Sequence, residues 1–270
     1  MRFKLYRTHG GAIVETTDGS FRPAAQDWDR LINQPALALE DLAPCDAPLE
    51  PDLLPPLGQQ EVWAAGVTYI RSREARMEES REAAADLYAR CYDAERPELF
   101  FKSMPQRVVG HGGQIRVRAD ATWSVPEPEL TLVINGDAKI VGYTIGNDVS
   151  SRDIEGQNAL YLPQAKIYEG SCAIGPCILM SDEALPTSTE IVLEILRDGP
   201  IEFRGKTSLA MIKRSLGDLV SYLFRELRFP HGCLLMTGTG IVPPSSFTLA
   251  SGDVVRISID GIGTLKNTVA

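Results

Sequence analysis

Two apolar runs joined by an Asn-Gly dipeptide constrain the fold of this chain more than any other feature. The first run, residues 130–134, has the composition of a half-buried strand, and residues 139–145 can run back beside it. Asn135-Gly136 between them is typical of a hairpin with a two-residue turn. The sequence therefore predicts an antiparallel pair of strands whose register is set by that turn.

Three carboxylates lie near the open end of this predicted hairpin. Glu127 and Glu129 are two residues apart, so both side chains point the same way along an extended chain. A two-residue turn places Asp148 on the same face but farther along, and a bend or bulge at Gly146 would bring it in. Hard divalent cations prefer such groups of oxygen ligands. The alternative is an exposed acidic edge strand, against which the third carboxylate and the prolines flanking the glutamates argue.

Further motifs follow in a fixed order along the chain. They are Glu127-Pro-Glu129, Asn147-Asp148-Val-Ser-Ser-Arg152-Asp153, Ala165-Lys166 leading to Gly175-Pro176, Thr237-Gly-Thr239-Gly240 and Ser251-Gly252-Asp253. This set resembles the fumarylacetoacetate hydrolase superfamily over residues 60–270. The resemblance implies an α+β, mostly β fold. It would be a mixed β-sandwich or roll like the C-terminal domain of that superfamily, with a small N-terminal α/β domain.

The same resemblance implies a metal cofactor. In the superfamily the acids that match Glu127, Glu129 and Asp148 hold magnesium or another divalent ion, so we expect Mg²⁺ here, with Mn²⁺ or Ca²⁺ as alternatives. The lysine that matches Lys166 helps to bind the substrate.

One departure from the superfamily pattern bears on the reaction. Its hydrolases carry Gly-x-Asn-Tyr-x-x-His, whose histidine belongs to a water-activating dyad, whereas this chain has Gly66-Val-Thr68-Tyr69-Ile-Arg71-Ser72. A lone serine is not a general base near pH 7, as a neutral imidazole is. This segment is more similar to the 2-keto-3-deoxy sugar acid dehydratases of the superfamily, such as 2-keto-3-deoxyarabinonate dehydratase-like members.

The expected function is therefore that of a metal-dependent dehydratase (a hydro-lyase), which converts, for example, a 2-keto-3-deoxy-pentonate to 2,5-dioxopentanoate. A C–C hydrolase of the acylpyruvate or fumarylacetoacetate type, or a keto-acid decarboxylase or isomerase, stays open as the alternative. A catalytically silent protein that binds a metal or a keto acid is a third possibility, against which the intact acids, Lys166 and Thr239 argue.

Elimination of water needs a base at C3 and an acid near the hydroxyl that leaves C4. Glu74 and Lys166 are the catalytic candidates. Arg152 can instead pair with Asp153, and Thr239 can serve only a backbone turn. The full set of candidate substrate ligands is Tyr69, Ser72, Arg73, Lys102, Arg152, Lys166 and Thr239.

Composition limits the partners of this chain. Its 270 residues include 27 Lys and Arg against 36 Asp and Glu, and the net charge of −9 argues against nucleic acids and anionic membranes. No apolar run is long enough to cross a bilayer, and the N-terminus lacks the apolar core of a signal peptide. Five cysteines without a Cys-x-x-Cys motif fit reduced thiols. We expect a cytoplasmic enzyme of small 2-keto acids that forms a homodimer or homotetramer.

Two units are expected along the chain. Residues 1–57 predict a small N-terminal domain that ends in a proline-rich linker, and residues 58–270 predict the catalytic domain. Within the first unit, alternating residues at 3–7 and 12–15 indicate a strand hairpin.

Two helices and one more turn are predicted within the catalytic domain. The charged segment 72–94 is expected to form a helix whose first turn closes over the acids as a lid. A second helix is predicted for residues 208–227, and Asp198-Gly199 predicts a tight hairpin turn.

Overall fold

The protein is described by a computed structural model, which places residues 2–34, 42–71 and 90–270. Most of the predicted lid helix, including Ser72, Arg73 and Glu74, lies outside these described residues. Within the described part, no helix is long and apolar enough to span a membrane.

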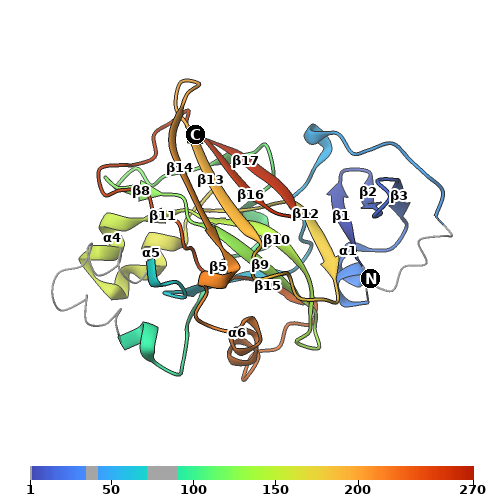
Figure 1. The fold of residues 1–270 in the computed structure, drawn as a ribbon, viewed down its shortest axis with the longest axis horizontal. Helices are drawn as coiled ribbons and strands as arrows, with labels where there is room; N and C mark the ends of the chain where they lie inside the picture. The colour runs from blue at the N-terminus through green and yellow to red at the C-terminus, as the bar shows by residue number, and fades with distance from the viewer. Residues whose placement is uncertain (1, 35–41, 72–89) are drawn as a thin grey trace.

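A large mixed sheet forms the body of the molecule (Figure 1). Its order in the described chain is β3-β2-β1-β12-β10-β9-β15-β4-β5, and β6 pairs with β12 beside this path. Most neighbours are antiparallel, but β15 runs parallel to β4, and β6 runs parallel to β12. The strands are β1 (Arg2–Thr8), β2 (Gly11–Glu15), β3 (Phe21–Ala24), β4 (Glu61–Gly66), β5 (Glu98–Ser103), β6 (Val108–Val109), β9 (Pro128–Ile134), β10 (Ile140–Asp148), β12 (Cys172–Ser181) and β15 (Cys233–Met236).

A second sheet packs against the middle of the large one, and Figure 1 shows its strands crossing in front. Its order is β14-β13-β16-β17-β7, with bounds β7 (Gln114–Ile115), β13 (Glu190–Leu196), β14 (Ile201–Ser208), β16 (Val254–Ile259) and β17 (Gly263–Val269). Alternating apolar residues such as Leu193 and Ile257 face Leu132 and Ile145 in one buried cluster. The two sheets are therefore held together by burial of apolar surface between their faces.

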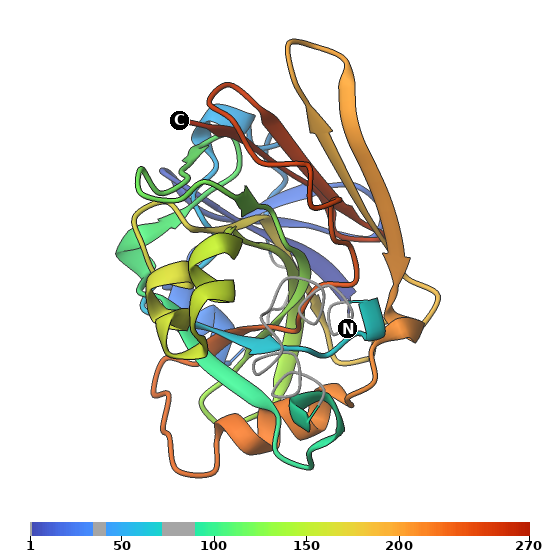
Figure 2. The same ribbon diagram turned by 90° about the vertical axis from the view of Figure 1, so that its left-hand side faces the viewer.

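Short elements surround the sheets. The strands β8 (Ser124–Val125) and β11 (Ser150–Ser151) pair with each other. In the described chain the α-helices are α1 (Trp28–Asn33), α4 (Arg152–Gln157), α5 (Leu162–Lys166) and α6 (Leu216–Leu223), and the 3-10 helices are η2 (Glu50–Asp52), η3 (Pro105–Arg107), η4 (Ala159–Tyr161) and η5 (Leu209–Met211). Figure 2 shows α4 and α5 side by side. The mostly β fold class predicted from the sequence is confirmed.

The N-terminal hairpin forms as predicted, and it joins the large sheet. Within it Lys4 pairs with Glu15. On its other side β1 pairs with β12, with Lys4 opposite Leu179. The proposed domain boundary near residue 57 stays a prediction, and any such boundary is crossed by this strand pairing.

Two local predictions have different outcomes. Asp198 and Gly199 both have a positive φ (52° and 108°), as a tight turn between β13 and β14 requires, so this hairpin is confirmed. The helix predicted for residues 208–227 is wrong in its bounds, because β14 continues to Ser208 and α6 begins only at Leu216. The Ser215 side chain starts α6 by accepting a hydrogen bond from the Asp218 N–H.

The strand pair β9–β10 forms, but its loop is longer than two residues. Ile134 pairs with Ile140, and Asn135 closes the loop by accepting from the Lys139 N–H through its side chain. A bulge then follows between Ile140 and Gly142. Together the longer loop and this bulge change the register of β10 against β9, which brings Asp148 beside Glu127 and Glu129.

This register places the third acid without a bend at Gly146. Asn147 pairs with Pro128, and the Asp148 N–H donates to Glu127 O (3.0 Å). The strand β9 is also fully buried rather than half-buried. Leu132 packs in the apolar cluster between the two sheets, and Val133 packs in a second apolar cluster on the opposite face of the large sheet.

Gly146 is required for packing instead. A Cβ at this position would overlap Thr131 Oγ1 and would lie 2.8 Å from Met236 Cε. Gly146→Ala should therefore lower the free energy of unfolding by about 1–3 kcal/mol, as overpacked core positions do. Urea unfolding followed by circular dichroism would measure the change.

Gly217→Ala is the matched control for this substitution. Gly217 lies in α6, and a Cβ there would meet no atom within 4 Å. Its replacement should leave stability unchanged or raise it by up to about 1 kcal/mol. Equal unfolding midpoints for Gly146→Ala and the parent protein would contradict the packing argument.

Candidate active site

The three predicted acids lie together at the ends of two neighbouring strands. Glu129 is in β9, Glu127 directly precedes β9, and Asp148 is the last residue of β10. All three side chains are buried, and one oxygen of each lies within 4.8 Å of an oxygen of the others. Within the described residues this is the one group of acidic, histidine or cysteine side chains that can hold a metal ion.

Lys166 ends α5 and points its ammonium into this group of acids. Its Nζ donates to Glu127 Oε2 (2.9 Å), Asp148 Oδ2 (2.9 Å) and Ser150 Oγ (2.6 Å). Ser150 in turn donates to the Asp148 carbonyl oxygen (2.9 Å). Lys166 thus lies at hydrogen-bond distance from two of the acids, next to the position of an ion that they would share.

Two further cations contact the same acids. Arg152 Nη2 lies 2.8 Å from Glu127 Oε1, whereas Asp153 Oδ2 accepts from the Thr122 backbone and hydroxyl. Arg152 therefore forms an ion pair with Glu127, whereas Asp153, the alternative partner considered from the sequence, contacts Thr122.

Lys102 is completely buried, and its contacts are to the protein. Its Nζ lies 2.5 Å from both Asp148 Oδ1 and the Lys166 carbonyl oxygen, and 3.2 Å from the Val149 carbonyl oxygen. Two of these contacts are hydrogen bonds to backbone carbonyl oxygens, and the third is an ion pair. Lys102 was predicted from the sequence to bind the substrate, and its geometry instead favours bracing Asp148 and Lys166.

Glu129 is electrostatically perturbed by its buried position among the other acids. Burial raises its pKa well above the usual 4.5, and the negative charges of Asp148 and Glu127 raise it further. The Gly238 N–H donates to Glu129 Oε2 (2.5 Å) and favours the ionised form. A divalent cation would relieve this repulsion between buried carboxylates, so the residues fit the metal predicted from the sequence.

Tyr69 and Thr239 lie close to the acids, whereas three predicted site residues are outside the description. Burial raises the pKa of Tyr69, and the charge of Glu129 adds to this effect. Thr239 lines the cavity, but its hydroxyl also accepts from the Ile241 N–H (3.2 Å), which supports the role in a turn. Ser72, Arg73 and Glu74 fall among the residues that the structure does not describe.

Sequence reasoning missed several side chains at this site. Glu98 from β5, Phe100 from β5 and Glu155 from α4 line the cavity beside the three acids, and Ser150 contacts Lys166. Glu155 follows Arg152 by three residues in a helix, a spacing that places both on one face. That spacing was the available signal, whereas nothing local in the sequence brings Glu98 to the acids.

The five cysteines are free thiols, as predicted. Cys172 is the one paired with Asp148 in the sheet. Burial raises the pKa of Cys172 to about 12, so its thiol stays protonated near neutral pH and is not a nucleophile.

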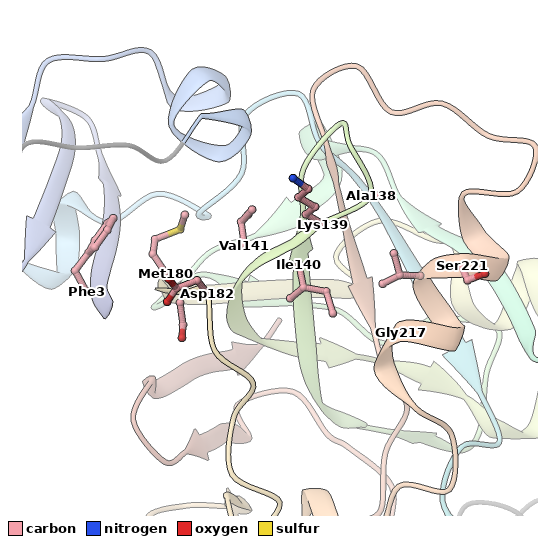
Figure 3. A pocket seen from close by; sticks show the side chains of 11 residues that line it. Phe3, Ala138, Lys139, Ile140, Val141, Met180, Asp182, Gly217 and Ser221 are labelled. Carbon is pink, nitrogen blue, oxygen red and sulfur yellow. The ribbon is translucent and has the colours of Figure 1, made fainter. Parts of the chain in front are cut away.

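A larger cavity lies elsewhere in the described structure. It has a volume of about 770 Å³, and Figure 3 shows it between the N-terminal strand, the β9–β10 hairpin and α6. Its walls are mainly apolar, with Phe3, Ile140, Met180 and Val220 among them. None of the three acids lines it. The candidate chemistry is therefore placed in the smaller cavity, which Glu127, Glu129 and Asp148 line.

Comparisons with known proteins agree with this geometry. The family profile of the fumarylacetoacetate (FAA) hydrolase C-terminal domain matches residues 73–270. A probable 2-keto-3-deoxyxylonate dehydratase of Haloferax volcanii is 49% identical over 215 residues, which cover 79% of this chain and 73% of that protein. A 2-dehydro-3-deoxy-D-arabinonate dehydratase of Saccharolobus solfataricus is 46% identical over 217 residues, with the same coverage. A solved structure of 2-keto-3-deoxy-D-arabinonate dehydratase complexed with magnesium and 2,5-dioxopentanoate has a TM-score of 0.86 at 34% identity, over 100% of this chain and 98% of that one.

Proposed function

This chain belongs to the fumarylacetoacetate hydrolase family, and we propose that within it the protein is a metal-dependent dehydratase of 2-keto-3-deoxy sugar acids. The observation that carries this proposal is the buried group Glu127, Glu129 and Asp148 with Lys166 beside it, in a chain 49% identical to a protein named as such a dehydratase. The magnesium in a related solved structure supports the same cofactor here.

The overall reaction is an elimination followed by an internal shift of protons. A C3 proton and the C4 hydroxyl leave a 2-keto-3-deoxy-pentonate as water. One proton then moves from C5 to C3, so that C5 becomes an aldehyde after tautomerisation and the product is 2,5-dioxopentanoate. A divalent ion held by Glu127, Glu129 and Asp148 would supply Lewis-acid polarisation of the 2-keto group.

The residues of the chain position the substrate and move its protons. Lys166, fixed by Glu127, Asp148 and Ser150, presents positive charge where charge develops on the keto oxygen. Glu98 lines the cavity and joins the predicted Glu74 as a candidate acid or base.

The remaining roles follow from position at the site. Arg152 and Thr239 line the cavity, and Tyr69 lies close enough to Glu129 to feel its charge. All three are proposed to shape the substrate site. For Ser72 and Arg73 the substrate contact stays a prediction. A cytoplasmic location and assembly into a homodimer or homotetramer likewise stay predictions, and a small keto acid is the expected partner.

Product analysis tests the proposed function directly. Purified enzyme with Mg²⁺ should convert a 2-keto-3-deoxy-pentonate, offered as each C4 enantiomer, to 2,5-dioxopentanoate with the loss of one water. Mass spectrometry and proton NMR would identify the aldehyde of equal carbon number. Cleavage of acylpyruvates to pyruvate and an acid, with the deoxy sugar acids left intact, would establish the hydrolase alternative instead.

A further inference from the structure

Phe100 lines the cavity beside the acids, but the proposed chemistry gives it no role so far. It lies in β5, where successive side chains point to opposite faces of the sheet. Glu98 lines the same cavity, and Lys102 contacts Asp148, so the face of β5 that carries Phe100 is the one turned toward the acids. An aromatic ring therefore lies between two charged side chains on this face.

The Phe100 ring presents its face to the Lys166 ammonium. The Lys166 Nζ lies over the ring, 5.7 Å from its centroid. A cation within about 6 Å of a ring centroid is attracted by the electron-rich face, most strongly where water is excluded. The Lys166 side chain is 1% exposed, so the contact with Phe100 is largely shielded from water.

The hydrogen bonds of the same ammonium are of two kinds. Two of them are made to Glu127 Oε2 and Asp148 Oδ2, and both of these residues belong to the group that can hold a metal ion. The third is made to Ser150 Oγ, outside that group. An ion bound by the acids would compete with Lys166 for carboxylate oxygens, but it would not compete for the ring or the hydroxyl.

We propose that Phe100 is a positioning residue, whose ring holds the Lys166 ammonium at the cavity when an ion occupies the acids. This inference rests on the metal-dependent dehydratase function proposed above. With the carboxylate oxygens engaged by the ion, N–H groups of Lys166 are released to the substrate, and the ring keeps the ammonium in place. An aromatic face suits this role because it attracts the ammonium without offering an oxygen to the ion.

Fluorinated phenylalanines at position 100 test the electrostatics of the ring with little change in its shape. Fluorine withdraws electrons from the ring, so one, two and three fluorines should weaken its attraction for a cation stepwise. We expect kcat with Mg²⁺ and a 2-keto-3-deoxy-pentonate to fall stepwise along this series, and by about 5–30-fold in Phe100→Leu. The affinity for Mg²⁺, measured by calorimetry, should stay at the parent value throughout.

Phe101 provides the matched control, because its ring lies on the opposite face of the same strand. It packs against Trp63 with the ring centroids 5.8 Å apart, away from the residues that line the cavity. The same fluorinated residues at position 101 should leave kcat unchanged. A kcat that is independent of fluorination at position 100, or that falls equally at both positions, would overturn the proposal and assign Phe100 a packing role.

Nuclear magnetic resonance of selectively labelled lysine tests the contact without turnover. Protons over the face of an aromatic ring resonate upfield, so the ε-methylene signal of Lys166, assigned by its loss in Lys166→Arg, should be shifted upfield in the parent protein and not in Phe100→Leu. The shift should persist after addition of Mg²⁺ and 2-oxopentanoate, which lacks the C4 hydroxyl and cannot be dehydrated. Loss of the shift on addition of Mg²⁺ would overturn the proposal. Failure of the dehydratase function would appear separately, as absence of 2,5-dioxopentanoate in the product analysis.

Discussion

Replacing Glu129 by glutamine should abolish magnesium-dependent dehydration, with a loss in kcat/KM of about 10²-fold or more. The reason is that a bound metal stabilises the charge of the transition state by several kcal/mol. The substitution keeps the shape of the side chain but removes one of three negative charges that can hold the ion. Magnesium affinity, measured by calorimetry, should fall together with activity. Full activity of Glu129→Gln, or of the parent enzyme after exhaustive treatment with EDTA, would contradict the proposed metal site.

The stability of the metal-free variant provides the control for this experiment. The raised pKa of Glu129 means that its contribution to folding is fully present below the ordinary value of 4.5 and is lost as the pH rises through the raised value. Glutamine does not titrate, so the variant escapes this loss. Metal-free Glu129→Gln should therefore unfold at the same temperature as the metal-free parent protein near neutral pH, or at a higher one. A large drop in that temperature would mean that lost activity reflects misfolding.

The acidic group could be predicted from the sequence, but the register that assembles it could not. The alternation of Glu127 and Glu129 along an extended chain is a local property. The position of Asp148 depends on the loop, where the Asn135 side chain accepts from two backbone N–H groups and Ala138 adopts a positive φ of 61°. Asn-Gly pairs favour two-residue turns on average, and here side-chain hydrogen bonding stabilised a longer loop. The bulge between Ile140 and Gly142 depends on packing within the whole sheet, which a local sequence pattern does not show.

The outer parts of the cavity depend even more on tertiary structure. Glu98 is one of several charged residues in its segment, and its approach to the acids requires β5 to lie beside β4 at the edge of the sheet. Lys102 was predicted from the sequence to bind the substrate because it follows three apolar residues of a strand. Its burial and its contacts with Asp148 and the Lys166 carbonyl could be seen only after the strands were assembled. Residue type therefore indicated the chemistry of the site. Whether a given lysine contacts the acids or the substrate could be decided only from its contacts in the folded chain.

Lys166→Met should separate catalysis from metal binding. Loss of a placed proton donor and positive charge predicts a fall in kcat of about 10²–10⁴-fold. The Lys166 ammonium occupies oxygens of Glu127 and Asp148 that an ion would also use, so its removal should leave magnesium affinity equal or higher. Calorimetry with magnesium and steady-state kinetics would measure the two quantities on the same preparation.

The thermal stability of this variant should depend on magnesium in a specific way. Removing one partner of a buried ion pair costs about 3–5 kcal/mol, so metal-free Lys166→Met should unfold at a lower temperature than the parent protein. Magnesium replaces the lost positive charge and should raise the unfolding temperature more in the variant than in the parent. Lys166→Arg keeps the charge but not the compact ammonium, and it should restore metal-free stability better than activity. The contrast with Glu129→Gln is decisive, because that variant should lose both the ion and the activity. If Lys166→Met also lost magnesium binding, Lys166 would be a structural support of the acids, and its proposed contact with the substrate would be wrong.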